Sequence, residues 1–427
     1  MIARDGAKES LWQHTAEELK TTATQGGIYD VIIAGAGITG ISLGLQLQKQ
    51  GLRCIVLEAN SICFGTTGGT TAHINTLLDT PYPGIIKDFG EDNALLVTQA
   101  VKVAMELFKT NIADYDIRCG FEEASAYLIA QDEDQVKELD GIQESCQKLN
   151  VQAGFSNNIP VPLPFIKAME IPSQAKFSPV EYVYALALVF ERLGGVIVQQ
   201  CRVINHQAQM DLVTGKELIE AGTSLEVSFY GKALVYATHI PTGVNVLHFR
   251  CAPYRSYAMA VKLEDDYPGG LIYDMYDPYH YYRTQEINGE KYFIAGGEDH
   301  KTGHEENTER CFHALEAHVR KFFKVKEITH QWSSQYFEPA DGLPYIGKLP
   351  GDTSNVYVAT GFGGNGITYS HVATLLLTDL IVNGSSKYEK VFSPNRVKPI
   401  AGFSNFIKEN ADVVKQFIAK WFAAEDL

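Results

Sequence analysis

One stretch, residues 29–60, restricts the fold of this chain more than any other. An apolar, β-branched run over residues 29–34 predicts a buried parallel strand. The chain then reads Gly35-Ala36-Gly37-Ile38-Thr39-Gly40 and continues with helical spacing of apolar residues as far as Gly51. A second apolar strand over residues 53–57 ends at Glu58. The pattern therefore predicts a βαβ unit with a glycine-rich turn at the start of its helix.

Each glycine of this turn has a separate task in a dinucleotide-binding unit. Gly35 permits the tight turn, Gly37 lets a pyrophosphate approach the backbone, and Gly40 lets helix and strand pack closely. The helix N-terminus attracts the phosphates, and Glu58 follows the first glycine at about the 20-residue distance that the motif requires. An acid here disfavours a 2′-phosphate, so the sequence predicts FAD or NAD and not NADP. The alternative is an ordinary strand–turn–helix without a ligand.

Composition excludes several other classes of protein. The chain has 427 residues, enough for two or three domains, and a formal net charge of −15, which opposes binding to nucleic acid or to anionic membranes. No apolar run reaches membrane-spanning length, and residues 1–27 lack the apolar core of a signal peptide. The seven cysteines are scattered singly, so we expect no disulfide framework and a cytoplasmic protein.

The order of the remaining segments suggests a discontinuous cofactor domain. An apolar strand over residues 233–238 breaks at His239-Ile240-Pro241, and another over residues 355–360 leads into a glycine-rich loop and a long helix. Between them, residues 251–297 read as tyrosine-rich strands that suit the wall of a pocket. NAD dehydrogenases usually complete their cofactor domain without interruption, so the interruption favours FAD.

The same residues resemble a known family. Val31–Gly40 with Glu58, the loop Gly65–Ala72, Trp332–Gly347 and Asn355–Ile367 resemble the FAD-dependent oxidoreductases of the D-amino-acid oxidase (DAO) family, which includes glycine oxidase and sarcosine oxidase. Residues 278–283 and 296–301 resemble a bacterial subgroup whose members often carry a C-terminal Rieske iron–sulfur domain. A Rieske site needs Cys-x-His and Cys-x-x-His pairs. Cys311 and His313 have the first spacing, but no cysteine has the second, so we expect no Rieske site in this sequence.

The resemblance implies an α/β (α+β) fold with two domains. Residues 28–80, 150–250 and 330–390 would form a discontinuous, Rossmann-like FAD-binding domain. Residues 81–149 and 251–329 would form a substrate or cap domain around a mixed, largely antiparallel sheet. Residues 400–427 are expected to form a C-terminal amphipathic helix.

The resemblance also implies which residues bind the cofactor. Four groups are expected around FAD: the first glycine-rich turn with the acidic strand end, the small-residue loop after it, single strands of the middle segment, and the second glycine-rich loop. They are Gly35, Ala36, Gly37, Ile38, Thr39, Gly40, Glu58, Ala59, Gly65, Thr66, Thr67, Gly68, Gly69, Thr70, Thr71, Val203, Ala237, Thr238, Gly361, Phe362, Gly363, Gly364, Asn365, Gly366, Ile367 and Thr368. The cysteine that links flavin in sarcosine oxidase matches Ser334 or Gln335, so non-covalent FAD is expected. No set of residues has the spacing of a metal site.

The substrate residues depart from the family pattern. Two arginines that hold the substrate carboxylate in simple amino-acid oxidases match Tyr336 and Gly364. The sequence therefore favours an amine, an N-substituted amino acid, or a substrate whose carboxylate lies further out. Arg283 is the expected anion anchor, with a surface or inter-strand ion pair as the alternative. The remaining substrate-binding candidates are Tyr282, Tyr336, Tyr257 and His280, and no catalytic residue is assigned.

The expected reaction is oxidation of a C–N bond by hydride transfer to flavin N5, which gives an imine that hydrolyses. The lysine that activates oxygen in sarcosine oxidase matches Gly296, so oxygen or another electron acceptor receives the electrons. Three alternatives remain: a flavin dehydrogenase of a 2-hydroxy acid or another small substrate, a flavoprotein subunit without catalytic activity, and an NAD-dependent enzyme.

Overall fold

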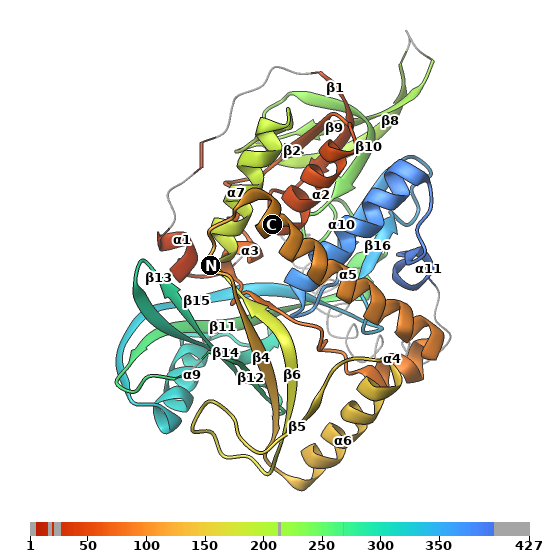
Figure 1. Ribbon diagram of the computed structural model, residues 1–427. Coiled ribbons are helices and arrows are strands. Elements are labelled where there is room, and N and C mark those ends of the chain that lie inside the picture. Colours follow the sequence, from red (N-terminus) through yellow and green to blue (C-terminus); the bar gives the residue numbers. More distant parts are fainter. Residues whose placement is uncertain (1–5, 16–18, 21–26, 212–214, 268, 397–427) are drawn as a thin grey trace, which may run out of the picture.

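Two β-sheets carry the fold in the computed structural model, which describes residues 6–15, 19–20, 27–211, 215–267 and 269–396. The first sheet lies in the upper half of Figure 1 and the second in the lower half. The predicted C-terminal helix at residues 400–427 lies outside the described residues.

The first sheet contains the predicted βαβ unit at its centre. Its main path runs in the order β16-β17-β10-β1-β2-β7. The neighbours from β17 to β7 pair in parallel, although they come from distant parts of the chain. The hairpin of β8 and β9 joins the edge of β10, and β16 pairs antiparallel with β17. The strands are β1 (Ile28–Ala34), β2 (Cys54–Leu57), β7 (Val196–Val198), β8 (Val203–Met210), β9 (Glu217–Thr223), β10 (Ser228–Tyr236), β16 (Tyr345–Lys348) and β17 (Val356–Thr360).

Alternate residues of the central strands enter two different hydrophobic cores, as the two-residue repeat of a strand requires. Val31 and Ile33 join the core that also contains apolar residues of helices α2, α5, α7 and α10. Ile32 and Ala34 join a second core with residues of the β8–β9 hairpin. Both faces of the parallel sheet are therefore covered, which explains the continuous apolar runs in the sequence. The helices are α2 (Ile38–Lys49), α5 (Glu91–Tyr115), α7 (Pro179–Arg192) and α10 (Gly366–Asn383).

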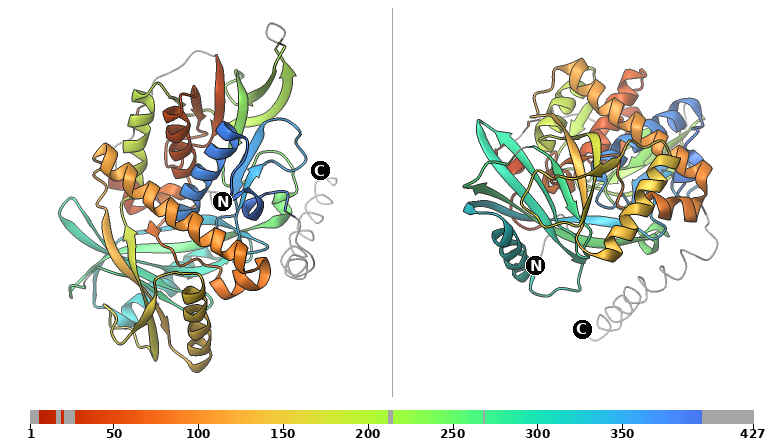
Figure 2. Two further views of the ribbon diagram at one scale, coloured as in Figure 1. Left: turned by 45° about the vertical axis from the view of Figure 1, so that its right-hand side comes forward. Right: turned by 60° about the horizontal axis from the view of Figure 1, so that its bottom comes forward.

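The second sheet is mixed and largely antiparallel, as predicted. Its path is β15-β11-β14-β13-β12-β4-β6-β3, with β5 paired to β6, and only the pair of β12 and β4 is parallel. Helix α9 packs on this sheet, as the turned views of Figure 2 also show. The elements are β3 (His73–Ile74), β4 (Glu122–Ala130), β5 (Gly154–Ser156), β6 (Lys167–Lys176), β11 (Cys251–Leu263), β12 (Leu271–Asp274), β13 (Tyr281–Ile287), β14 (Glu290–Lys301), β15 (Val325–Pro339) and α9 (Thr308–Phe322).

The chain passes between the sheets more often than the expected domain boundaries imply. Strands β5 and β6 belong to the second sheet, although they fall within residues 150–250, which the sequence places in the FAD-binding domain. The long pairing of β6 with β4 places them there. The sequence pattern of residues 167–176 interrupts its apolar residues with Lys167, Glu170 and Gln174, so it gives no clear strand signal.

Six further helices are described in the structure. Near the N-terminus, residues 11–15 form a five-residue helix. The remaining elements are α1 (Leu11–Thr15), α3 (Thr66–Gly69), α4 (Tyr82–Phe89), α6 (Glu133–Lys148), α8 (Leu247–Arg250) and α11 (Glu389–Phe392). Among the described residues, no helix is both long enough and apolar enough to cross a membrane.

Candidate functional site

A long cavity lies where the parallel strands of the first sheet end. The segments after β1, β2, β10 and β17 all contribute to its lining, together with strands of the second sheet. Ligands of open parallel sheets bind outside the carboxyl ends of the strands, and this cavity has that position.

The turn between β1 and α2 places the start of a helix against this cavity. A Cβ atom on Gly40 would lie 1.9 Å from the carbonyl oxygen of Gly35, and one on Gly35 would lie 2.7 Å from that of Ala237. Larger residues would separate strand and helix, so these glycines permit the close approach. The backbone N–H groups of the first turn of α2 therefore stay beside the cavity, where they favour an anion.

Glu58 fixes the glycine-rich turn from the end of β2. Its carboxylate accepts hydrogen bonds from the backbone N–H groups of Ala36, at 2.7 Å, and Asn60, at 2.8 Å. Glu58 also lines the cavity, beside Arg202 and Val203 from the start of β8. An acid that both holds the turn and lines the cavity matches the ribose-binding position of a dinucleotide site.

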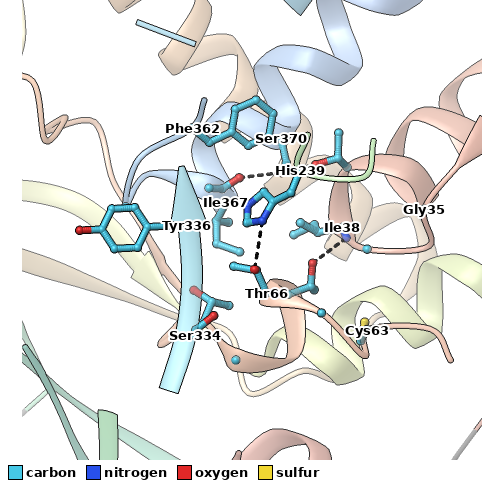
Figure 3. Close-up of a pocket in the computed structure, with 18 of the residues that line it drawn as sticks. Gly35, Ile38, Cys63, Thr66, His239, Ser334, Tyr336, Phe362, Ile367 and Ser370 are labelled. Carbon is cyan, nitrogen blue, oxygen red and sulfur yellow. Dashed lines mark hydrogen bonds between the residues drawn. The ribbon is translucent and has the colours of Figure 1, made fainter. Parts of the chain in front are cut away.

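The small-residue loop that follows β2 borders the middle of the cavity. Thr67 accepts a hydrogen bond from the backbone N–H of Ile38 at 3.0 Å, and its neighbour Thr66 pairs with His239 at 3.3 Å. Figure 3 shows Thr66 and His239 in contact at the wall of the cavity, with Ser334 and Tyr336 on a separate strand. Three distant segments of the sequence therefore meet at this loop.

Helix α1 holds the same loop from the outside. The indole N–H of Trp12 donates to the carbonyl oxygen of Thr70 at 2.7 Å, and Gln13 donates to the carbonyl oxygens of Cys63 and Phe64 at 3.2 and 3.1 Å. Trp12 is 1% exposed. The N-terminal segment is thus a support for the cavity wall, a role that its polar sequence does not indicate.

The second glycine-rich loop places a second helix start at the cavity. The backbone N–H of Gly364 donates to Asp79 at 2.6 Å, and the side-chain oxygen of Asn365 accepts from the backbone N–H of Asp79 at 2.7 Å. Ser370, in the first turns of α10, shares a hydrogen bond of 2.7 Å with Thr39 of α2. The two helices are therefore fixed to each other with both of their first turns at the cavity.

Strands of the second sheet close the other end of the cavity with tyrosines and an acid. The hydroxyl of Tyr336 donates to Asp299 at 2.9 Å, and the hydroxyl groups of Ser256 and Tyr281 lie 3.1 Å apart. Burial raises the pKa of Asp299 to about 7, and the charge of Asp79 adds to this rise. Burial also raises the pKa of Asp79 to about 6.

The structure brings most of the sequence-predicted residues to this one cavity. Among the cofactor candidates, Ala36, Gly40, Gly68, Gly361 and Thr368 do not line it but belong to lining segments. Among the substrate candidates, Tyr257 and Tyr336 line it, whereas Arg283, Tyr282 and His280 do not. The lining cofactor candidates are Gly35, Gly37, Ile38, Thr39, Glu58, Ala59, Gly65, Thr66, Thr67, Gly69, Thr70, Thr71, Val203, Ala237, Thr238, Phe362, Gly363, Gly364, Asn365, Gly366 and Ile367.

Arg283, the expected anion anchor, points instead into protein. Its guanidinium donates to the carbonyl oxygens of Thr71, Ala72 and Phe177 at 2.8, 2.6 and 3.2 Å, and it also bonds Gln285. The side chain is 1% exposed, and it lies 5.1 Å from the ring of Trp12. The inter-strand ion pair considered from the sequence is also not what the structure shows, because the contacts above are to neutral oxygens. Arg283 joins the second sheet to the loop below the cavity.

Tyr282 and His280 lie on the side of β13 away from the cavity. Tyr282 pairs with His318 of α9, and His280 contacts Asp274 at 2.9 Å and Glu298 at 3.3 Å. Asp274, His280 and His318 are close enough to share a metal ion. Since both ring nitrogens of His280 already contact carboxylates, hydrogen bonds account for this cluster. The alternation of a strand explains the difference, because the neighbouring Tyr279 and Tyr281 face the cavity.

Sequence reasoning missed Asp79 and Asp299. Asp79 follows two leucines in a segment without a repeat, so nothing in the sequence marks it. Asp299 lies in the segment 296–301, whose sequence indicates a family resemblance but no role for this acid. The register of the sheet shifts opposite this residue, between Arg255 and Tyr257, and Glu298 has a φ of 57°. Such a bulge redirects a side chain, and a period of two does not reveal it.

We predict that Arg283→Met destabilises the fold without a direct effect on a ligand. The change leaves three buried carbonyl oxygens without their donor, at a cost of about 3 kcal/mol in the free energy of unfolding. Urea unfolding of the variant measures the loss. Arg118→Met is the control, because the side chain of Arg118 is 90% exposed, and it should stay within about 0.5 kcal/mol of the parent. Equal stability of both variants would contradict the role assigned to Arg283.

Comparison with known proteins agrees with this arrangement. Residues 30–380 match the DAO family model, described as FAD dependent oxidoreductase. The chain is 31% identical over 415 residues to YhfW of Bacillus subtilis (strain 168), whose name describes it as a putative Rieske 2Fe-2S iron–sulfur protein. The aligned region covers 96% of this chain and 80% of YhfW. It is 23% identical to gamma-glutamylputrescine oxidoreductase of Escherichia coli (strain K12), over 84% of this chain and 85% of that protein.

Solved structures share the fold. Glycine oxidase from Geobacillus kaustophilus superposes with a TM-score of 0.72 at 18% identity, over 87% of this chain and 99% of that one. Together with the family match and the cavity, this similarity confirms the predicted fold class and the expected cofactor. The chain belongs to the DAO family of FAD-dependent oxidoreductases, and its cofactor is FAD.

Proposed function

We propose that this protein oxidises a C–N bond of a small amine or amino-acid derivative, with FAD bound along the cavity. The observation that carries the proposal is the single cavity that joins two glycine-rich helix starts to a tyrosine-lined end. Gamma-glutamylputrescine oxidoreductase among the relatives supports an amine substrate by its name, as does glycine oxidase among the structures of this fold.

The residues fit an extended FAD molecule. Glu58 and Val203 would bind the adenosine end, and the start of α2 with Thr67 would bind the pyrophosphate. The second loop would present the N–H groups at the start of α10 to the flavin, where a helix N-terminus stabilises negative charge. The position that links flavin in sarcosine oxidase is Ser334 or Gln335 here, and neither is a cysteine. The cysteine in the described lining is Cys63, in the loop after β2. We therefore propose non-covalent FAD.

The protein's part in the reaction is to bind, orient and exclude water. FAD supplies the two-electron acceptor. Oxidation removes a hydride from carbon and a proton from nitrogen, and water then converts the imine into a carbonyl compound and an amine or ammonia. The tyrosine-lined end would hold the reacting carbon in a dry environment. Tyr336 and Gly364 occupy the two positions where simple amino-acid oxidases have arginines that hold the substrate carboxylate, so this chain has no arginine there.

The proposal is tested by the visible spectrum of the purified protein under anaerobic conditions. We expect flavin bands near 370 and 450 nm, released into solution by denaturation, that bleach on addition of an amine. Recovery on admitting air identifies oxygen as the acceptor, and recovery only with an added quinone or dye identifies a dehydrogenase. Bleaching by 2-hydroxy acids alone, or by no compound in a panel of amines and hydroxy acids, would refute amine oxidation.

We predict that Gly37→Val abolishes FAD retention. A Cβ atom at this position would lie 2.8 Å from the hydroxyl oxygen of Thr67, and the larger side chain would fill the cavity beside the start of α2. The measurement is the ratio of absorbance at 450 and 280 nm. Gly141→Val is the control, because a Cβ atom on Gly141 has no neighbour within 4 Å. A yellow, saturated Gly37→Val protein would exclude this site for the pyrophosphate.

Trp12→Phe tests whether the N-terminal helix supports the cofactor loop. The variant loses the indole donor to Thr70 and leaves a carbonyl oxygen unpaired, so the dissociation constant of FAD should rise about 5- to 10-fold. Titration of the apoprotein with FAD measures the change. His14→Ala, on the exposed side of the same helix, should bind FAD like the parent. Unchanged affinity in Trp12→Phe would show that the loop keeps its position without this hydrogen bond.

A further inference from the structure

The two ends of the cavity differ in charge. Arg202 is the one lysine or arginine among the described lining residues, and it follows Cys201, whose backbone N–H donates to the carbonyl oxygen of Glu58. The cation is therefore at the adenosine end. Asp79 and Asp299 line the opposite end, where their bonds to Gly364 and Tyr336 place them.

Tyrosine rings surround these two acids. Tyr279, Tyr281 and Tyr336 all line the cavity, and the rings of Tyr279 and Tyr281 have centroids 5.6 Å apart. A Cβ atom on Gly364 would lie 3.1 Å from the hydroxyl oxygen of Tyr279 and 2.6 Å from Asp79. The faces of aromatic rings attract cations, and most strongly where water is excluded. The lining is therefore suited to positive charge on a ligand.

Two polar atoms at this end lack a partner in the protein. The Oδ1 atom of Asp299 is buried without a hydrogen bond, and so is the hydroxyl of Ser334, which is 9% exposed. Ser334 and Tyr336 lie two residues apart on β15 and line the same cavity. Unsatisfied buried acceptors are costly, so a donor from a ligand would stabilise this end.

We propose that the substrate is a diamine or polyamine and that Asp299 is the specificity-determining residue that binds its second, protonated nitrogen. This inference rests on the proposed amine oxidation and extends it. A nitrogen whose C–N bond is oxidised must be neutral, whereas a buried carboxylate among tyrosines selects a cation. One molecule with two nitrogens satisfies both requirements, with the neutral one at the flavin and the charged one at Asp299.

The proposal predicts a pH dependence of binding. The raised pKa of Asp299, about 7, leaves it largely neutral below that pH and negative above it. The hydroxyl groups of Ser256 and Tyr336 hydrogen-bond to Asp299 and favour its charged form, the charge of Asp79 opposes that form, and the charge of His280 favours it. Affinity for a diamine that stays protonated should therefore increase as the pH rises from 6 to 8. Tyr336→Phe removes a bond to the charged form and should move this increase to higher pH.

The experiment compares 1,4-diaminobutane, butylamine and N-methylglycine as reductants of the holoenzyme in anaerobic titrations. We expect 1,4-diaminobutane to reduce the flavin at concentrations about tenfold lower than butylamine. Asp299→Asn should raise the concentration needed for 1,4-diaminobutane by about 10- to 100-fold and leave that for butylamine unchanged. Asp266→Asn is the control, because this aspartate is 81% exposed and pairs with Lys291.

Each other outcome has a distinct meaning. Equal losses for both amines in Asp299→Asn would make Asp299 structural and overturn the inference. Reduction by N-methylglycine but not by 1,4-diaminobutane would also overturn it, while amine oxidation would stand. If Asp299→Asn fails to retain FAD, the pH profile of Tyr336→Phe decides, and an unshifted profile counts against the proposal. Reduction by hydroxy acids alone would refute the proposed function itself.

Discussion

The close contact between β1 and the start of α2 is the constraint on which the site depends. Gly40 can lie against the carbonyl oxygen of Gly35 only because it has no side chain. This contact places the first turn of α2 beside the cavity. Glu58 holds the preceding turn in position by accepting a hydrogen bond from the backbone N–H of Ala36. The parallel pairing of β10 and β17 beside β1 brings the later loops to the same edge. A substitution that separated β1 from α2 would therefore disturb the whole cofactor site.

Hydrogen bonds from Arg283 and Trp332 to neutral carbonyl oxygens fasten the second sheet to this edge. Arg283 donates to Thr71 and Ala72 of the loop beside the cavity and to Phe177 before α7. Trp332 of β15 donates to the carbonyl oxygen of Gly69 at 2.8 Å. The loop Gly65–Ala72 is rich in glycine and threonine and has few large side chains of its own for packing. Long side chains from other elements therefore hold its backbone. Its position therefore depends on the relative placement of both sheets.

The sequence predicts the cofactor half of the site better than the substrate half, for a physical reason. Gly35, Gly37 and Gly40 perform tasks that are set by local backbone geometry, so their spacing alone is informative. Arg283 could not be placed in this way, because it lies on the same face of β13 as the cavity-lining Tyr281. Its role is set by the carbonyl oxygens of Thr71, Ala72 and Phe177, which come from distant parts of the chain. Residues 279–283 place tyrosine together with a basic or imidazole side chain on each face of the strand, so their pattern does not identify the inner face. Asp299 depends on a bulge opposite Ser256, which only the pairing of β11 and β14 reveals.

The replacement of two arginines changes the electrostatics of the substrate end as well as its contacts. An arginine at position 336 or 364 would stabilise the carboxylates of Asp79 and Asp299 and would hold their pKa values low. With Tyr336 and Gly364 there instead, burial raises both pKa values. Without a cationic ligand nearby, the negative charge of Asp79 disfavours ionisation of Asp299. A positively charged ligand would stabilise both carboxylates in their ionised form. A cavity of this kind disfavours a substrate carboxylate at the place where simple amino-acid oxidases require one, since like charges would meet in a dry environment.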